Sequence, residues 1–221
     1  MEPLTGAAPR PALDPDSPFR FIGGDVAVDF VNTVDWTSRG LEVDRFTSYV
    51  RLLEWARGAG VIDGATAERL ARRAAADPYA ARAVMHEAAS LRGVLERIFR
   101  ALTSHGDVTR PIAELNDGML RRAAGALAVV PRNDGSLALG WPSLADALVL
   151  PLIVIAWRVA ALLASGDVHE LQRCGGVDCG SYFVDRSRNG LRRWCDMETC
   201  GTREKSRRRA ARRASASNSS R

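Results

Sequence analysis

Apolar side chains recur with the period of an amphipathic helix along the middle of the chain. The longest such run spans residues 78–104, with apolar positions four or three residues apart: Val84, Ala88, Leu91, Leu95, Ile98 and Leu102. This spacing predicts one long helix with a single buried face. Pro78 suits its first turn, where no amide hydrogen is needed. Three charged residues share the opposite face at i, i+4 spacing and are expected to be solvated: Arg92, Glu96 and Arg100.

Shorter apolar stripes upstream predict further helices. One stripe within residues 47–60 has four apolar members: Tyr49, Leu52, Leu53 and Ala56. Gly58 or Gly60 can end this helix as its C-cap. A short helix is expected at residues 65–76, and the segment 23–36 places Val28, Val31 and Val34 near one helical face.

Residues 126–164 follow two other patterns. Two short apolar runs flank Asn133-Asp134-Gly135, which predicts a β-hairpin. Ser143 then opens a helix with Asp146 completing a capping box, and Pro151 should kink or split that helix. Residues 145–164 are apolar nearly all round, which is typical of a central buried helix. We therefore expect residues 19–166 to form a mainly α domain of the α+β class with one small β-hairpin.

Composition fits a soluble protein with a sizeable core. The chain has 221 residues, of which 46% are hydrophobic. Residues 1–18 hold five prolines and no apolar run, which predicts a disordered leader and argues against a secretory signal. The longest apolar run, residues 148–157, is far shorter than the roughly 20 residues that a membrane span needs. We expect a cytoplasmic protein with no membrane partner.

Positive charge is concentrated at the C-terminus. The formal net charge is +5, but residues 168–221 carry +7 and residues 1–167 carry −2. Such asymmetry favours a nucleic-acid-binding or membrane-surface segment over a generally basic protein. A membrane surface is the weaker alternative, because no aromatic or aliphatic face accompanies the charge.

The same C-terminal region contains all four cysteines, Cys174, Cys179, Cys195 and Cys200, spaced C-x4-C-x15-C-x4-C. Two close pairs separated by a loop suit a tetrahedral structural Zn²⁺ site. The alternatives are disulfides, which rarely persist in the cytoplasm, and a redox pair, which usually has x2 spacing. Four thiolates leave no open position for a catalytic zinc. Between the pairs, residues 181–185 and 191–195 are expected to form a hairpin around Asn189-Gly190.

Basic residues follow the last cysteine almost without interruption and are expected to form a helix beginning near Thr202. Guanidinium groups bind phosphates and guanine edges in a bidentate manner, so this segment is a candidate DNA-binding surface. The alternative is a solvated basic tail with non-specific affinity for polyanions. The candidate contacts are Arg186, Arg188, Arg192, Arg193, Arg203, Lys205, Arg207, Arg208, Arg209 and Arg212. Residues 214–221 are expected to be a disordered tail.

These residues resemble a known family. The stretch "RCGGVDCGSYFVDRSRNGLRRWC" followed by "CGTREKSRRRAARR" is similar to the CGNR zinc finger of bacterial transcription regulators. Thr202 replaces the asparagine of the naming motif, and we expect it to cap the following helix. "VDFVNTVDW", "LLEWARGAGVI" and "LQRCG" resemble the ABATE domain, described as a stress-induced transcription regulator domain. The resemblance implies DNA binding by residues 168–213 and a ligand-sensing role in stress response for residues 19–166.

Other candidate sites are weaker. His86, His105 and His169 are far apart, and no catalytic motif accompanies them, so we expect no enzyme activity. Three residues could line a small-molecule effector pocket, although capping and packing explain them as well: Asp29, Asn32 and Trp36. The rival function is a ligand-binding or enzymatic domain whose finger contacts protein or RNA. One finger offers little specificity, which leaves a homodimer open.

Overall fold

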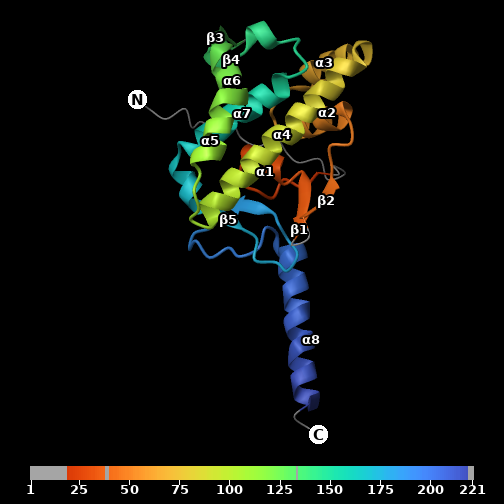
Figure 1. Ribbon diagram of the computed structural model, residues 1–221, viewed down its shortest axis with the longest axis vertical. Helices are drawn as coiled ribbons and strands as arrows, with labels where there is room; N and C mark the ends of the chain where they lie inside the picture. Colours follow the sequence, from red (N-terminus) through yellow and green to blue (C-terminus); the bar gives the residue numbers. More distant parts are fainter. Residues whose placement is uncertain (1–18, 38–39, 133, 219–221) are drawn as a thin grey trace.

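Over residues 19–37, 40–132 and 134–218, the computed structural model shows a mainly helical body with three two-stranded antiparallel sheets (Figure 1). Backbone alone is described at residues 36–37, 40–42 and 214–218. The predicted leader, residues 1–18, lies outside the described part. The predicted fold class, mainly α with small hairpins, is confirmed.

The N-terminal half of the body runs from a short helix into a hairpin and then three longer helices. Its elements are α1 (Val26–Val31), β1 (Val34–Thr37), β2 (Gly40–Asp44), α2 (Tyr49–Gly58), α3 (Gly64–Ala76) and α4 (Pro78–Thr103). Ser48, Asp63 and Asp77 begin α2, α3 and α4, and each side chain accepts a backbone amide of the first turn. These N-caps satisfy amides that have no partner within the helix, which fixes where each helix begins.

The long helix α4 confirms the strongest periodic pattern, with one correction. Val84, Leu95 and Ile98 are buried on the face that the spacing predicts. Arg92, expected on a solvated face, is only 4% exposed. It pairs with Asp44 and donates to Thr33 at 3.0 Å, because the β1–β2 hairpin covers this part of α4. The periodic pattern of one helix does not show which of its polar residues another segment will bury.

The segment 23–36 is not one helix. The helix α1 ends at Val31, and Val34 is a buried residue at the start of β1, which pairs with β2. Asn32 caps α1, and its side-chain amide is held by the backbone of Tyr182, 150 residues further on. The chain therefore leaves the helical path at Asn32, which contacts β6, and continues into the β1–β2 hairpin, and neither feature is contained in the helical periodicity.

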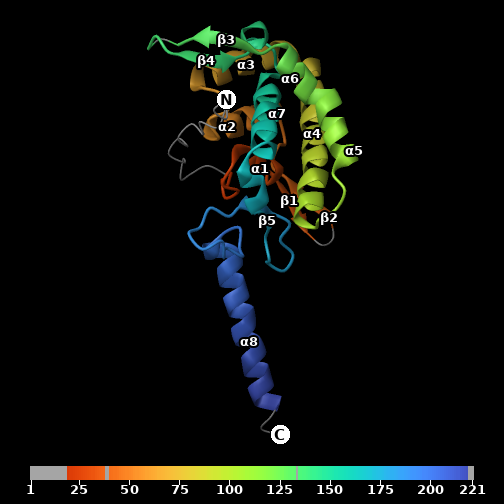
Figure 2. The ribbon, with the colours of Figure 1, turned by 90° about the vertical axis from the view of Figure 1, so that its left-hand side faces the viewer.

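The second half of the body carries the central helix. Its elements are α5 (Thr109–Leu115), η1 (Asn116–Leu120), α6 (Arg121–Gly125), β3 (Ala128–Pro131), β4 (Leu137–Gly140), η2 (Pro142–Leu144) and α7 (Leu150–Leu163). The predicted hairpin around Asp134-Gly135 is confirmed as β3–β4, although Asn133 itself lies outside the described residues. Figure 2 shows α7 running through the middle of the body with this hairpin across one end.

The start of α7 corrects two predictions. The helix begins at Leu150 rather than near Ser143, and Pro151 therefore sits in its first turn and causes no kink. Asp146 pairs with Arg69 of α3 at 2.8 Å instead of capping a helix. The interior placement of α7 was predicted correctly, since Leu152, Ile153 and Ile155 are fully buried.

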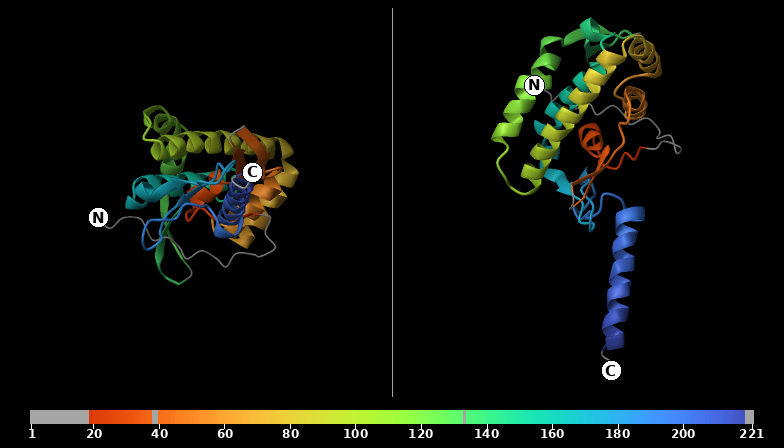
Figure 3. Two further views of the ribbon diagram at one scale, coloured as in Figure 1. Left: turned by 90° about the horizontal axis from the view of Figure 1, so that it is seen from below. Right: turned by 45° about the vertical axis from the view of Figure 1, so that its right-hand side comes forward.

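The C-terminal region begins on the body and ends far from it. Its elements are η3 (Gly166–Glu170), β5 (Leu171–Arg173), β6 (Tyr182–Val184), η4 (Met197–Gly201) and α8 (Thr202–Asn218). Figures 1 and 3 show α8 projecting away from the body as a single rod. The backbone stays helical to Asn218, so the tail expected from residue 214 continues the helix for most of its length.

Two hydrophobic clusters hold these parts. The main core includes Leu171, Tyr182 and Val184, so the β5–β6 sheet packs against the helical body. A second, smaller cluster surrounds the cysteines and contains Phe183 and Trp194. Neighbouring residues of β6 thus point into different clusters, which couples the C-terminal module to the body.

No helix within the described residues is long and apolar enough to cross a membrane.

Candidate metal centre and basic helix

The four cysteines converge as the spacing predicts. Their Sγ atoms all lie within 4.8 Å of one another. Cys195 Sγ lies 3.8 Å from Cys179 Sγ and 3.6 Å from Cys200 Sγ. All four are free thiols, so the disulfide alternative is excluded in this structure.

This arrangement fits a zinc ion. Zn–S bonds of about 2.3 Å in a tetrahedron place neighbouring sulfur atoms about 3.8 Å apart, which agrees with the observed separations. Three of the four cysteines are buried, and Cys179 is half-buried. A bound Zn²⁺ would be held by Cys174, Cys179, Cys195 and Cys200, and would supply a structural cross-link with no open coordination position.

Backbone amides support the thiolates. Cys174 Sγ accepts hydrogen bonds from the amides of Gly176 and Cys195, at 3.4 and 3.3 Å. Asp178 adopts a left-handed conformation with φ of 58°, which turns the chain back so that Cys179 faces Cys174. Tight turns and N–H···S contacts of this kind orient the ligands and stabilise their charged form.

The crowding of the thiols perturbs their protonation. Hydrogen bonds from Cys174 and Cys195 lower the pKa of the Cys179 thiol. Hydrogen bonds with Cys174 and Cys179 raise the pKa of the Cys195 thiol. Burial raises the pKa of Cys200 to about 11. Without a cation the cluster shares its protons, and a divalent ion at the centre would allow all four sulfur atoms to be thiolates.

The loop between the pairs is not the predicted hairpin. The strand β6 pairs with β5, and residues 191–195 form no strand. Asp185 is buried, and its carboxylate accepts the amides of Ser187 and Arg192 at 2.9 and 2.8 Å. The Ser187 side chain and, to a smaller extent, these amides lower the pKa of Asp185. The two amide hydrogen bonds close the loop on itself, which removes residue 192 from strand pairing.

Arg192, predicted as a nucleic-acid contact, makes several contacts within the protein. Its guanidinium lies 4.3 Å from the centroid of the Phe183 ring and donates to the carbonyls of Trp194, Ile22 and Cys195. It thereby joins the metal module to the segment that precedes α1. Arg186 is also engaged, since it pairs with Asp167 at 2.5 Å.

Two of the three residues proposed for an effector pocket bind backbone: Asn32 joins the module to the body, and Asp29 holds the segment before α1. Asn32 Nδ2 donates to the Tyr182 carbonyl at 2.8 Å, and Asn32 Oδ1 accepts the Tyr182 amide at 2.9 Å. Asp29 is 1% exposed and accepts the Gly23 amide at 2.6 Å. Both polar side chains thus bind backbone groups, and Asn32 also lines a cavity of about 250 Å³ beside the cysteines. The side chain of Trp36 lies outside the described part.

The basic helix begins within the metal module. Asp196 is the N-cap of η4, accepts the amide of Glu198 at 3.0 Å and pairs with Arg20. Because η4 runs directly into α8, Thr202 does not cap the helix as predicted; its hydroxyl donates to the Met197 carbonyl at 3.2 Å. The last ligand, Cys200, lies inside η4, so the metal would fix the direction of α8.

Glu204 is the only acid among the α8 residues whose side chains are described. It is buried; its Oε2 accepts from Arg207 and its Oε1 from both Arg207 and Arg208, each at 2.8 Å. These guanidinium groups lower the pKa of Glu204 to about 2. The remaining cations on α8 are exposed: Arg203, Lys205, Arg209, Arg212 and Arg213. Arg188 and Arg193 are exposed on the preceding loop.

Sequence reasoning located the metal ligands but missed the residues that attach the module. The roles of Arg20, Asn32, Arg192 and Asp196 depend on contacts between distant segments. The sequence does contain one local indication of the closed loop. Asp185 precedes a turn that contains Gly190, and an aspartate side chain often accepts the backbone amide of the residue two positions further along the chain.

The helical body and the four-thiolate module define a metal-binding protein with a C-terminal zinc finger. Residues 24–166 match the ABATE family, described as "Putative stress-induced transcription regulator", and residues 170–213 match the CGNR zinc finger. The chain therefore belongs to the ABATE family and carries a CGNR zinc finger, which confirms the resemblance. No curated protein matches it.

Proposed function

We propose that this protein is a zinc-dependent, DNA-binding transcription regulator whose helix α8 makes the main DNA contacts. The observation that carries the proposal is a free-standing, arginine-rich helix whose first turn grows out of the metal site. A helix without an apolar stripe gains nothing by packing on the body, so its surface suits a polyanion.

The dimensions of α8 fit a DNA groove. Its 17 residues correspond to a length of about 25 Å, and a helix with side chains is about 10–12 Å across. The major groove of B-DNA is about 12 Å wide and admits such a helix. Arginines on several sides of the rod could then contact phosphates on both groove walls while others reach base edges.

Glu204 sets which part of α8 is most electropositive. It neutralises much of the charge of Arg207 and Arg208 near the metal module. The net positive charge therefore increases toward Arg209, Arg212 and Arg213. We expect this distal half to dominate the salt-dependent part of DNA affinity.

Fluorescence anisotropy of labelled DNA duplexes at increasing KCl tests the proposal. The triple variant Arg209→Gln/Arg212→Gln/Arg213→Gln removes three cations from the distal half of α8, and Arg72→Gln/Arg82→Gln/Arg110→Gln removes three exposed cations from the body. Each lost phosphate contact reduces the slope of log K against log salt by about 0.9, so the first triple should reduce it by about 2–3. The second triple should behave as wild type.

Zinc dependence is measured in the same assay after treatment with a chelator. Binding that persists without metal, or equal losses in both triple variants, contradicts the proposal. A duplex RNA of the same sequence is the comparison for the rival partner. Since the RNA major groove is too deep and narrow to be read by side chains, DNA should bind more tightly.

A single projecting helix contacts one half-site, so tight specific binding to a longer operator calls for two copies of the chain. Sedimentation of the complex on a two-half-site duplex gives the stoichiometry.

We also propose a non-enzymatic role, because the three histidines are exposed and lie on separate segments of the described chain.

A further inference from the structure

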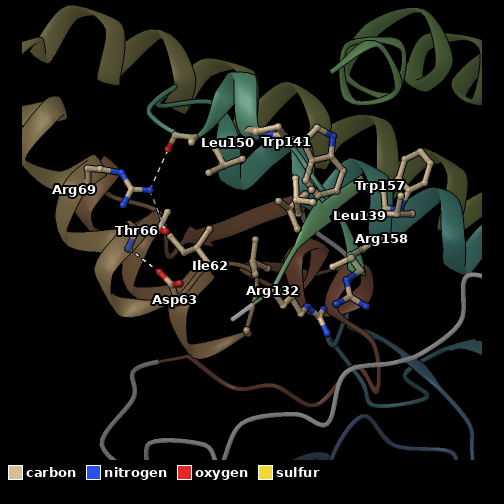
Figure 4. A pocket seen from close by; sticks show the side chains of 18 of the residues that line it. Ile62, Asp63, Thr66, Arg69, Arg132, Leu139, Trp141, Leu150, Trp157 and Arg158 are labelled. Carbon is tan, nitrogen blue, oxygen red and sulfur yellow. Dashed lines mark hydrogen bonds between the residues drawn. The ribbon is translucent and has the colours of Figure 1, made fainter. Parts of the chain in front are cut away.

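A second site lies in the helical body, at the end opposite to α8. A cavity of about 720 Å³ opens between α3, α7 and the β3–β4 hairpin (Figure 4). Its apolar wall includes Ile62, Val130, Leu139, Trp141, Val154 and Trp157. Pockets of about 300–1,000 Å³ with a mainly apolar lining are typical of small-molecule sites.

The central helix α7 explains why the cavity exists. Its residues Leu152, Ile153, Ile155 and Val159 are completely buried in the core. A second stripe on the same helix faces the cavity at helical spacing: Leu150, Val154, Trp157, Arg158 and Ala161. Four of these five residues are only half-buried. A helix that is apolar on both faces thus has one face in the core and the other in the pocket.

Two tryptophans form a fixed aromatic corner of the pocket. The rings of Trp141 and Trp157 meet edge to face, with centroids 6.2 Å apart and planes at 71°. Trp141 Nε1 donates to the Ala123 carbonyl at 2.8 Å, which holds that ring in place. A planar apolar group could pack against this corner without any rearrangement of the rings.

The charged residues that line the pocket differ in whether another group of the protein binds them. Arg69 binds Asp146 at 2.8 Å and also the Ala145 carbonyl, and Asp63 is occupied as the N-cap of α3. Within the described residues, neither the Arg132 nor the Arg158 guanidinium forms an ion pair with a carboxylate of the pocket, although the charge of Asp134 in the β3–β4 turn acts on Arg132. Figure 4 shows their two guanidinium groups gathered at one edge of the pocket. Two like charges held there leave a net positive potential beside an aromatic wall.

From this arrangement we propose that the pocket binds an amphipathic organic anion. Its apolar, preferably aromatic, body would pack against Trp141 and Trp157, and its acid group would pair with Arg132 and Arg158. Guanidinium groups bind carboxylates and related anions through parallel hydrogen bonds, which suits an acid at this edge. The inference rests on the proposed regulatory function only in naming the ligand an effector; binding itself is independent of DNA.

The probe is 8-anilinonaphthalene-1-sulfonate, and its neutral analogue N-phenyl-1-naphthylamine lacks the acid group. Both are titrated by fluorescence into the zinc-loaded full chain without DNA. The double variant Arg132→Gln/Arg158→Gln should weaken binding of the sulfonate at least about tenfold, because both cationic partners of the acid group are lost. It should leave binding of the neutral analogue unchanged. Near-UV circular dichroism checks that the variant is folded.

Two further variants make the location testable. Ala161→Phe places a ring in the pocket beside Trp157 and should reduce binding of both probes. Arg209→Gln/Arg212→Gln/Arg213→Gln on α8 should change neither. The proposal is overturned by an absence of sulfonate binding to wild type, by full binding to the pocket variants, or by loss of binding in the α8 variant. It is also overturned if the arginine variant weakens the neutral probe as much as the sulfonate. Because no DNA is present, these outcomes are distinct from failure of the proposed DNA binding.

Discussion

At the scale of single residues, polar side chains under the surface determine how the segments fit together. Arg92 joins α4 to the β1–β2 hairpin through Asp44 and Thr33, with Phe46 5.1 Å from its guanidinium. Asn32 joins α1 to β6 by mimicking a backbone pair. Each buried polar group is satisfied, and removing one partner would leave the other without its hydrogen bonds.

Replacing Arg92 with methionine should lower the free energy of unfolding by about 2 kcal/mol. The loss is smaller than the roughly 3–5 kcal/mol typical of a broken buried pair, because Asp44 keeps a side-chain exposure of 36% and can be hydrated. Urea unfolding of the zinc-loaded protein measures it. Arg97→Met on the same helix removes an exposed pair with Glu114 and should cost less than about 1 kcal/mol. Equal losses would mean that the Arg92 network is no stronger than a surface ion pair.

Asn32→Asp keeps the shape of the side chain but places an oxygen against the Tyr182 carbonyl. We expect destabilisation of about 1–3 kcal/mol and faster hydrogen exchange of the β5–β6 amides, because the donor to that carbonyl is lost. Asn116→Asp changes an exposed residue of η1 in the same chemical way and serves as the control. Unchanged exchange in β6 would show that Asn32 does not hold the two parts together.

At the scale of elements, glycine allows the metal module to be compact. A Cβ at Gly176 would lie 3.3 Å from Cys200 Sγ, 3.4 Å from Cys174 Sγ and 3.2 Å from Cys179 Cβ. Such contacts are tighter than ordinary van der Waals packing, and two of the three atoms are metal ligands. At Gly176 the turn therefore depends on the missing side chain rather than on an unusual backbone angle of the glycine.

Gly176→Ala should weaken zinc affinity about tenfold, by displacing ligand sulfur atoms from their positions. Competition with a chromophoric chelator measures the change. Gly166→Ala is the matched control, because a Cβ there meets nothing within 4 Å. If both variants hold zinc as tightly as wild type, the ligands can adjust and the close approach has no consequence.

The elements also show what sequence patterns could and could not predict. Helix α4, the α2 stripe and the β3–β4 hairpin depend on neighbours in sequence, so periodicity and turn residues were sufficient for them. The cysteine spacing likewise predicted the thiol cluster. The burial of Arg92 depends on Thr33 and Asp44, 59 and 48 residues away. The strand at Val34 and the pairing of β6 depend on which neighbouring strand pairs with them, β2 and β5 respectively. Local patterns carry no information about such partners, and those predictions were wrong.

At the scale of the whole molecule, the zinc finger and the body share structure. Tyr182 and Val184 are in the main core, whereas Phe183 lies between them in the metal cluster. Burial raises the pKa of Tyr182 to about 12, and its hydroxyl lies 3.4 Å from Glu96 of α4. Loss of the metal should therefore also destabilise the helical body.

Chelation of zinc should reduce the far-UV helical signal by the contribution of α8 and lower the melting temperature of the body by several degrees. The first effect follows from loss of the anchored start of α8, and the second from loosening of β6. Circular dichroism of the same sample before and after chelation, with zinc added back, measures both. A helical signal that does not change on chelation would show that α8 forms without the metal.

The projecting helix has a kinetic consequence. Starting a helix is the unfavourable step, whereas extending it is nearly neutral, and an isolated helix of this length is marginal in water. Here the first turn is already closed by Asp196 and Cys200 within η4. The metal-loaded module thus nucleates α8, and the helix should fray from its C-terminal end. Hydrogen exchange should quicken steadily from Glu204 toward Asn218, and a bound duplex should slow it most at the distal turns.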